Sequence, residues 1–145
     1  MRRIFIDSST FVPAAYSERS PARALLTAAQ NQQVTLIISP LVLSETERAL
    51  RNKLPQALPY FEYAVSIIPF ERVQPTAKDL AQAEGVTIDP FDVPIVAAAK
   101  IAKVDALVSY NIKHLFTKQV SDYIGAPVLT DAQMMRLIRE EQSKK

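Results

Sequence analysis

Short apolar runs and amphipathic segments alternate along the whole chain. Short runs of β-branched residues and leucine are typical of strands buried inside a parallel sheet. We predict such strands at residues 3–6, 34–38, 65–70, 106–109 and 128–129. Between most of these runs, apolar residues recur every three or four positions, as they do on the buried face of a helix. The pattern therefore predicts strands and helices in alternation.

Capping residues mark where several of the helices begin. Residues 20–21 and 39–40 are both Ser-Pro, a capping hydroxyl followed by a proline suited to the first turn. Asp92 is expected to cap a helix that holds Pro94 in its first turn. Thr130 opens a capping box before the last helix. Before this last helix, the predicted helices cover residues 21–29, 40–48, 56–64, 76–84 and 93–102.

This alternation favours an α/β fold, a three-layer α/β/α sandwich with a mostly parallel central sheet. The 145 residues fit a single domain, residues 1–145. In open parallel sheets, ligands bind beyond the carboxyl ends of the strands. Polar residues that follow strands are therefore the first candidates for a site.

Composition narrows the class of protein. Hydrophobic residues make up 48% and charged residues 22%, as in soluble globular domains. The absence of cysteine excludes disulfides and thiolate metal sites, and together with the lack of a signal peptide or membrane span it favours the cytoplasm. Only two glycines occur, which excludes Gly-rich phosphate loops. A net charge of +2 neither indicates nor excludes nucleic-acid binding.

Four acidic or amide residues occupy positions that the topology can bring together. Asp7 ends the first predicted strand, and Glu45 lies in the helix after the second. Asp92 precedes the helix before the fourth strand, and Asn111 follows that strand. Clustered carboxylates repel one another unless a cation offsets their charge, and oxygen ligands of this kind suit Mg²⁺ or Mn²⁺. A metal so held can activate water against a phosphodiester.

At these positions the chain resembles the PIN-domain nucleases. The resemblance spans nearly the whole chain and rests on IFIDSS (residues 4–9), SPLVLSE (39–45), DPFDVPIVAAA (89–99) and VSYN (108–111), in the family's order and spacing. It implies an α/β/α sandwich and a Mg²⁺- or Mn²⁺-dependent endoribonuclease. Many PIN proteins of this length are VapC-type toxins of toxin–antitoxin pairs, so the resemblance also implies RNA as substrate, a cognate antitoxin and a homodimer.

The resemblance assigns roles residue by residue. Asp7, Glu45 and Asp92 match the three principal acids, expected to hold the metal and act in catalysis. Asn111 stands where many members have a fourth aspartate, and an uncharged amide there favours one firmly bound ion rather than two. Three further residues are expected to help to bind the substrate: Ser9, Lys113 and His114.

Several secondary expectations accompany these assignments. Asp89 is interpreted as a turn residue before proline, with a fifth acid near the site as the alternative, and Glu47 as pointing away from the site. Four lysines flank the proposed rim and are either phosphate ligands or ordinary solvated residues: Lys100, Lys103, Lys113 and Lys118. An apolar set is a candidate dimer surface: Leu41, Val42, Leu58, Tyr60 and Phe61.

Two rival interpretations remain open. The first is a catalytically degenerate PIN-like module that binds RNA or protein and in which the acids are relics, and Asn111 favours this interpretation. A phosphorelay receiver or a haloacid-type phosphatase fits less well. A receiver needs paired acids before its phosphorylated strand, and the phosphatase needs an aspartate where Ser9 stands.

Overall fold

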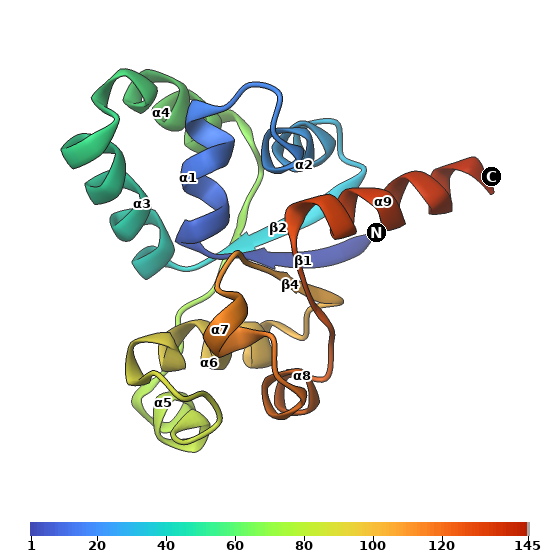
Figure 1. Ribbon diagram of the computed structural model, residues 1–145. Coiled ribbons are helices and arrows are strands. Elements are labelled where there is room, and N and C mark those ends of the chain that lie inside the picture. Colours follow the sequence, from blue (N-terminus) through green and yellow to red (C-terminus); the bar gives the residue numbers. More distant parts are fainter. Residues whose placement is uncertain (145) are drawn as a thin grey trace.

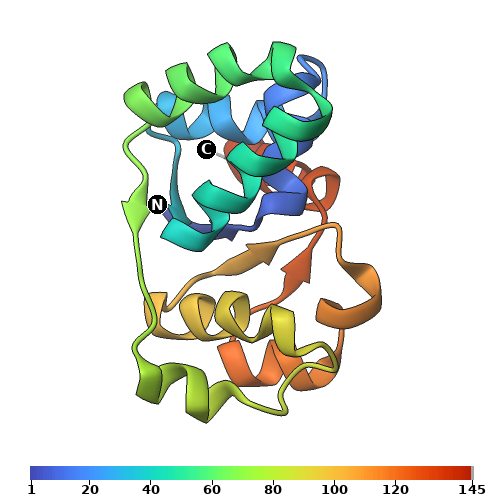
Figure 2. The same ribbon diagram turned by 90° about the vertical axis from the view of Figure 1, so that its left-hand side faces the viewer.

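The computed structural model describes residues 1–144, which form a five-stranded sheet between two layers of helices (Figures 1 and 2). The strand order is β3-β2-β1-β4-β5, and every neighbouring pair is parallel. The strands are β1 (Arg2–Ile6), β2 (Val34–Ile38), β3 (Glu71–Arg72), β4 (Ala106–Val108) and β5 (Val128–Leu129).

Helices α1 to α4 and α9 pack on one face of the sheet, and α5, α6 and α8 cover the other (Figure 1). The helices are α1 (Ser8–Tyr16), α2 (Pro21–Gln30), α3 (Pro40–Lys53), α4 (Leu58–Ile67), α5 (Ala77–Ala83), α6 (Val93–Ala102), α7 (Ile112–Leu115), α8 (Lys118–Ile124) and α9 (Asp131–Ser143). Two 3₁₀ turns, Pro55–Ala57 and Pro90–Asp92, precede α4 and α6. The three-layer α/β/α fold expected from the sequence is confirmed, with a sheet that is parallel throughout the described residues.

The central strand β1 is apolar because helices cover both of its faces. Ile4, Phe5 and Ile6 are fully buried. Ile4 pairs with Leu36 of β2 on one side and with Ala106 of β4 on the other. Burying three large side chains at about 1.5–3 kcal/mol each makes β1 a major source of stability, and it fixes the register of its neighbours.

The capping signals begin helices where the sequence predicts them. The Ser20 hydroxyl accepts a hydrogen bond from the backbone N–H of Arg23, and Ser39 accepts one from Val42. Thr130 and Gln133 form the expected reciprocal capping box at the start of α9. Each cap satisfies backbone donors that the first helical turn leaves without a partner.

The strand predicted at residues 65–70 is wrong. Helix α4 continues to Ile67, and the strand that follows, β3, is short and exposed. Phe61, Ala64 and Ile68 are buried at the spacing of a helical face, and Phe61 packs on Phe11 of α1 with ring centroids 5.1 Å apart. A short apolar run does not by itself distinguish the end of a helix from a strand.

Three helices lie outside the predicted set. Helix α1 follows β1 directly, with Asp7 as its cap, and it contains Pro13. Helices α7 and α8 fill the segment between β4 and β5. Their short lengths leave too few turns for a periodic apolar face to be recognised in the sequence.

Within residues 1–144, no helix is both long enough and apolar enough to cross a bilayer. The single PIN-like domain expected over residues 1–145 stays a prediction, and its last residue lies outside the described part.

Candidate metal centre

The strand order reverses beside β1, and the candidate residues gather there. The chain runs from β1 outward to β2 and β3, then returns to place β4 on the other side of β1. Asp7 follows β1, and Ser109 follows β4. Ligand sites of open α/β sheets lie at such a switch point, because the connections on either side diverge and leave a crevice.

Asp7 is a buried carboxylate held by three hydrogen bonds. Its Oδ1 accepts from the Ser9 hydroxyl at 2.6 Å and from the Thr10 backbone N–H at 3.2 Å. Its Oδ2 accepts from the Ser109 hydroxyl at 2.6 Å. Burial raises the pKa of Asp7 above its usual value and the charge of Asp92 adds to this, while the hydrogen bonds act in the opposite direction. The site therefore holds this carboxylate firmly but lacks the positive charge that would stabilise its ionised form.

Ser109 is a site residue that sequence reasoning missed. Its buried hydroxyl donates to Asp7 and accepts from the backbone N–H of Asn111 at 2.9 Å. Ser9, on the other side of Asp7, accepts from the N–H of Tyr110 at 2.9 Å. The signal available in the sequence is a hydroxyl residue that closes an apolar strand. The two serines join the ends of β1 and β4 through Asp7.

Asp92 and Asn111 meet at the same edge of the sheet. The Asn111 side-chain amide donates to Asp92 Oδ2 at 3.0 Å, and its Oδ1 accepts from the His114 backbone N–H at 3.3 Å. The amide nitrogen, rather than the oxygen, therefore faces the acids. Burial and the neighbouring Asp89 raise the pKa of Asp92, against the opposing contributions of Asn111 and His114.

The prediction that α6 begins after Asp92, with Pro94 in its first turn, is confirmed, but Asp92 holds the cap position through its backbone alone. The Asp92 side chain makes no capping hydrogen bond, and the Asp89 carboxylate instead accepts from the N–H of Phe91 at 3.0 Å. Asp89 therefore starts the 3₁₀ turn that leads into α6, and Asp92 remains available to the site.

Glu45 approaches the aspartates from α3. It is half-buried, and its pKa is raised by burial first and then by the charges of Asp7 and Asp92, with Arg48 opposing. Glu47 pairs instead with Arg51 at 2.6 Å on the exposed side of α3. Three carboxylates on three different elements thus act on one another electrostatically.

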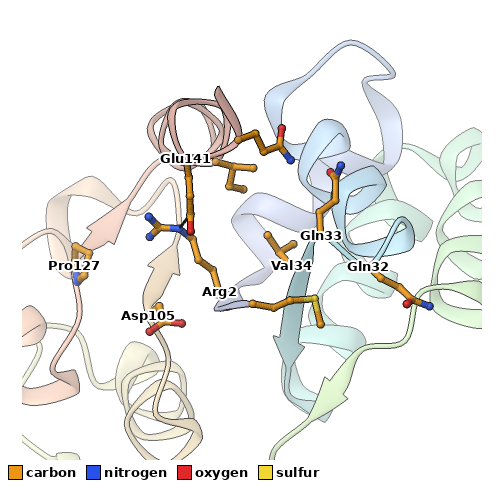
Figure 3. Close-up of a pocket in the computed structure, with 10 residues that line it drawn as sticks. Arg2, Gln32, Gln33, Val34, Asp105, Pro127 and Glu141 are labelled. Carbon is orange, nitrogen blue, oxygen red and sulfur yellow. Dashed lines mark hydrogen bonds and ion pairs between the residues drawn. The ribbon is translucent and has the colours of Figure 1, made fainter. Parts of the chain in front are cut away.

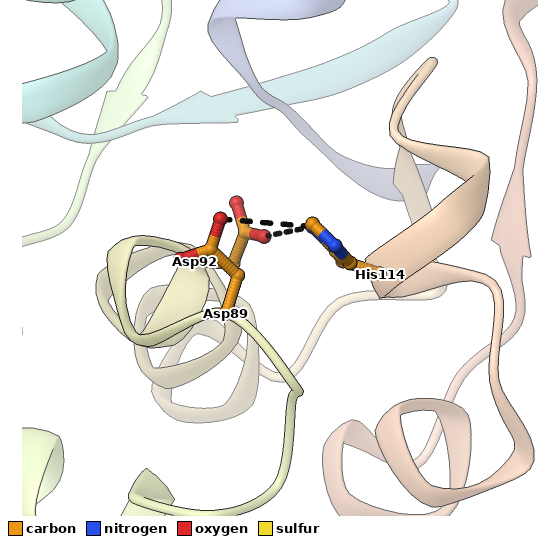
Figure 4. A group of neighbouring side chains, drawn as sticks. All are labelled: Asp89, Asp92 and His114. Atoms are coloured by element: carbon orange, nitrogen blue, oxygen red, sulfur yellow. Dashed lines mark ion pairs between the residues drawn. The ribbon is translucent and has the colours of Figure 1, made fainter.

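A compact group of possible ligands lies at one side of this cluster. Oxygen or nitrogen atoms of Asp89, Asp92 and His114 lie within 4.8 Å of one another (Figure 4). His114 Nδ1 is 3.4 Å from Asp92 Oδ2 and 3.6 Å from Asp89 Oδ2. Among the described residues, Asp7, Glu45 and Asp92 do not form a group this tight. Asp89 is therefore both the residue that starts the turn and a possible metal ligand.

The donor set suits a hard divalent cation. Burial raises the pKa of Asp7, Glu45 and Asp92, and a neighbouring carboxylate adds to it in each case, Asp89 being that neighbour for Asp92, so each carboxylate is costly to ionise without a counter-charge. A divalent ion would offset that cost, and carboxylate oxygens are the ligands that Mg²⁺ and Mn²⁺ favour. Asp92 belongs to both the compact group and the wider triad.

The predicted basic residues lie in three locations. Lys113 and His114 lie in α7, next to Asn111. Lys100 and Lys103 lie in the last turn and at the cap of α6, about 15 Å along the helix from Asp92, so their expected place at the rim is wrong. Lys118 pairs with Asp122 at 2.9 Å on the exposed side of α8.

The predicted dimer surface also needs correction. Val42 and Phe61 are buried in the core, at 0% and 5% exposure, so neither can contribute to an interface. Leu41 is exposed, and Leu58 and Tyr60 are partly buried against the core.

A hollow of about 710 Å³ lies at the amino ends of the strands, near the start of β1 (Figure 3). Arg2 pairs there with Glu141 of α9 at 2.6 Å, and Asp105 accepts from the backbone N–H of Arg3. This hollow lies far from the carboxyl ends of the strands, where the candidate residues gather, and is therefore separate from the candidate site.

Comparison with known proteins agrees with the fold. A family model described as PIN domain matches residues 3–113. VapBC2 from Rickettsia felis, solved with a DNA fragment from the promoter, is 20% identical over 77% of this chain and 89% of that one, with a TM-score of 0.58. PAE2754 from Pyrobaculum aerophilum is 15% identical over 94% and 89%, with a TM-score of 0.60.

A third structure, VapC20 from Mycobacterium tuberculosis, is described as a sarcin–ricin loop cleaving toxin. It is 16% identical over 76% of this chain and 91% of that one, with a TM-score of 0.53. At these identities the likeness concerns the fold alone. No curated protein matches the sequence.

Proposed function

Because the chain belongs to the PIN-domain family, we propose that it is a metal-dependent endoribonuclease and the toxin component of a toxin–antitoxin pair. The observation that carries the proposal is the convergence of Asp7, Glu45 and Asp92 at the sheet's switch point, each with a raised pKa. Three such carboxylates have a physical reason to recruit a divalent cation.

Asp7 and Asp92 are proposed to hold Mg²⁺ or Mn²⁺, with Glu45 as a further ligand or as the group that positions water. When bound, the ion lowers the pKa of a water and neutralises charge on the phosphate. Ser9 and Ser109 keep both oxygens of Asp7 in place through their hydrogen bonds. Asn111 restrains one oxygen of Asp92, which leaves the other free to face the ion.

The residues of α7 are proposed to contact the RNA. Lys113 supplies a positive charge next to Asn111, and His114 lies beside Asp92. Phosphate contacts of this kind position a nucleic acid without reading its sequence. We place the activity in the cytoplasm, and a cognate antitoxin is the proposed partner because the Rickettsia felis relative is a VapBC pair.

The test is cleavage of single-stranded RNA with Mn²⁺, comparing the wild type, Asp7→Asn and Asp122→Asn. Asp122 is an exposed acid of α8 outside the cluster, so its variant controls for the loss of one surface charge. We expect cleavage by the wild type and Asp122→Asn, and loss by at least about 100-fold in Asp7→Asn. Equal cleavage by all three would remove Asp7 from the site.

The alternative is a degenerate PIN-like module that binds RNA or protein. The amide nitrogen of Asn111, directed at Asp92 where a fourth carboxylate is usual, favours it. Calorimetry that detects RNA binding but neither Mg²⁺ nor Mn²⁺ binding would select this alternative. The homodimer expected from the resemblance stays a prediction, to be checked by the molar mass in solution.

A further inference from the structure

A second hollow, of about 530 Å³, opens beside Asp7 between α1, α3 and the end of β4. Ser8, Ser9, Val12 and Tyr16 line it from α1, Ala49 lines it from α3, and Tyr110 closes it from the segment after β4. The described residues that line it carry no charged side chain. The hollow therefore suits a neutral group rather than a phosphate.

Two tyrosines give this hollow an aromatic lining. Tyr16 is 53% exposed and Tyr110 is 41% exposed, so both rings have surface available to a ligand. Both tyrosines line the same hollow, Tyr16 from α1 and Tyr110 from the segment after β4. Rings on two separate elements thus border one space.

The Tyr110 ring is held in place at both ends. Its backbone N–H donates to the Ser9 hydroxyl at 2.9 Å, and its own hydroxyl donates to the buried carboxylate of Asp131. The other oxygen of Asp131 accepts from the backbone N–H of Ala132 at 2.8 Å. A ring fixed in this way loses little conformational freedom on binding, which favours its use as a contact surface.

The hollow is continuous with the acid cluster. Ser9 lines the hollow and donates to Asp7, and the backbone of Tyr110 donates to Ser9. A nucleotide whose phosphate lies at Asp7 can therefore direct its base into the hollow. Unpaired bases are recognised by stacking on aromatic side chains, which tolerates any base because each has a π-face.

We propose that this hollow binds one unpaired nucleobase of the substrate next to the scissile phosphate, stacked on Tyr16 and Tyr110. The inference rests on the proposed nuclease function and adds to it a site for the base of one nucleotide. It also makes Tyr16 and Tyr110 substrate-binding residues that hold the base, separate from the acids.

The test measures binding and cleavage of a short single-stranded RNA by Tyr16→Leu, Tyr110→Leu and Tyr16→Phe. Tyr63→Leu is the matched control, because Tyr63 of α4 is 52% exposed and lies outside the lining of the hollow. We expect each leucine variant at the hollow to raise Kd and KM by about tenfold with a smaller change in kcat. Tyr63→Leu should resemble the wild type, and Tyr16→Phe should bind RNA more tightly than Tyr16→Leu because it keeps an aromatic face for stacking.

A spectroscopic readout tests stacking directly. RNAs carrying 2-aminopurine at successive positions, bound to Asp7→Asn to prevent cleavage, should show quenched fluorescence at one position beside the cut. Adding Tyr16→Leu or Tyr110→Leu should relieve that quenching. Far-ultraviolet circular dichroism and thermal unfolding confirm that each variant is folded, so that a loss of binding is not a loss of structure.

The outcomes separate this inference from the nuclease proposal. If the wild type does not cleave RNA, the nuclease proposal fails. If the wild type cleaves and the leucine variants keep its KM and its quenching, the nuclease stands and the base site is refuted. If the variants lose binding to a partner protein while RNA binding is unchanged, the hollow is a protein-docking site and the inference is likewise overturned.

Discussion

Replacing Asp7 with asparagine should stabilise the metal-free protein while it removes activity. In the wild type, Asp7 is buried, and the charge of Asp92 acts on it. As a scale for this repulsion, two like charges one physiological Debye length apart, about 8 Å, repel by about 2 kcal/mol at an effective dielectric constant near 20. After allowance for weaker hydrogen bonds to a neutral amide, we expect a net gain of about 1 kcal/mol in the free energy of unfolding. For a domain of this size the gain raises Tm by about 4 °C.

The hydrogen-bond network can accept the amide. The asparagine oxygen takes over the bonds from the Ser9 hydroxyl and the Thr10 N–H. Its NH₂ group donates to the Ser109 oxygen, and the Ser109 proton then turns to the Ser9 hydroxyl, which is 3.3 Å away. No donor of the wild type loses its partner, and the only new unsatisfied group in this network is the second N–H of the introduced amide.

The assay is thermal unfolding of the wild type, Asp7→Asn and Asp122→Asn, first with a chelator and then with Mn²⁺. A ligand at 100 times its Kd stabilises the folded state by about 2.7 kcal/mol. The wild type and Asp122→Asn should gain most of this, and Asp7→Asn much less. A lower Tm for Asp7→Asn in chelator, or equal Mn²⁺ stabilisation of all three proteins, would refute the reasoning.

The sign of the pH dependence gives a second check on the same variant. The pKa of Asp7 is raised in the folded state, so the folded protein binds more protons than the unfolded chain between the two pKa values. Stability is therefore lost as the pH rises through that window, and the loss is complete above the folded pKa. The advantage of Asp7→Asn should vanish below the unfolded value of 3.8 and be largest at neutral pH.

Three further predictions follow from the same network. Ser109→Ala should lower the free energy of unfolding by about 1–3 kcal/mol in chemical denaturation, because Asp7 loses a hydrogen-bond donor. The same loss should shift the pH profile of cleavage toward higher pH, and an unchanged profile would contradict this. Asn111→Asp should lower Tm in chelator by placing a like charge against Asp92 and tighten Mn²⁺ binding by calorimetry, and weaker Mn²⁺ binding would count against it. Cleavage should fall as the pH falls through the raised pKa values of Asp7, Glu45 and Asp92, since metal ligands must be deprotonated; a rate independent of pH in that range would exclude these ligands.

The sequence predicts best where the signal is local. A Ser-Pro pair caps a helix through atoms within three residues, so the starts of α2 and α3 are readable without the fold. Asp7 is a candidate because it follows an apolar strand, and parallel topology alone brings its neighbours to the same edge.

The errors arise where tertiary packing decides. Residues 65–67 belong to α4 because the preceding Phe61 packs on α1, a contact that local pattern does not report. The orientation of the Asn111 amide depends on Asp92, which is 19 residues away in the sequence and adjoins it only after folding. Ser109 escapes notice because a single hydroxyl at a strand end is common, and only the folded chain places it against Asp7.

Both outermost strands of the sheet, β3 and β5, are only two residues long. Strands this brief present few unpaired backbone groups, so they are poor templates for recruiting an extended segment from another polypeptide. The protein is consequently guarded against edge-to-edge aggregation. Any lasting assembly, whether with a second copy or with a different polypeptide, has to be made through side chains on its helical surfaces rather than by lengthening the sheet.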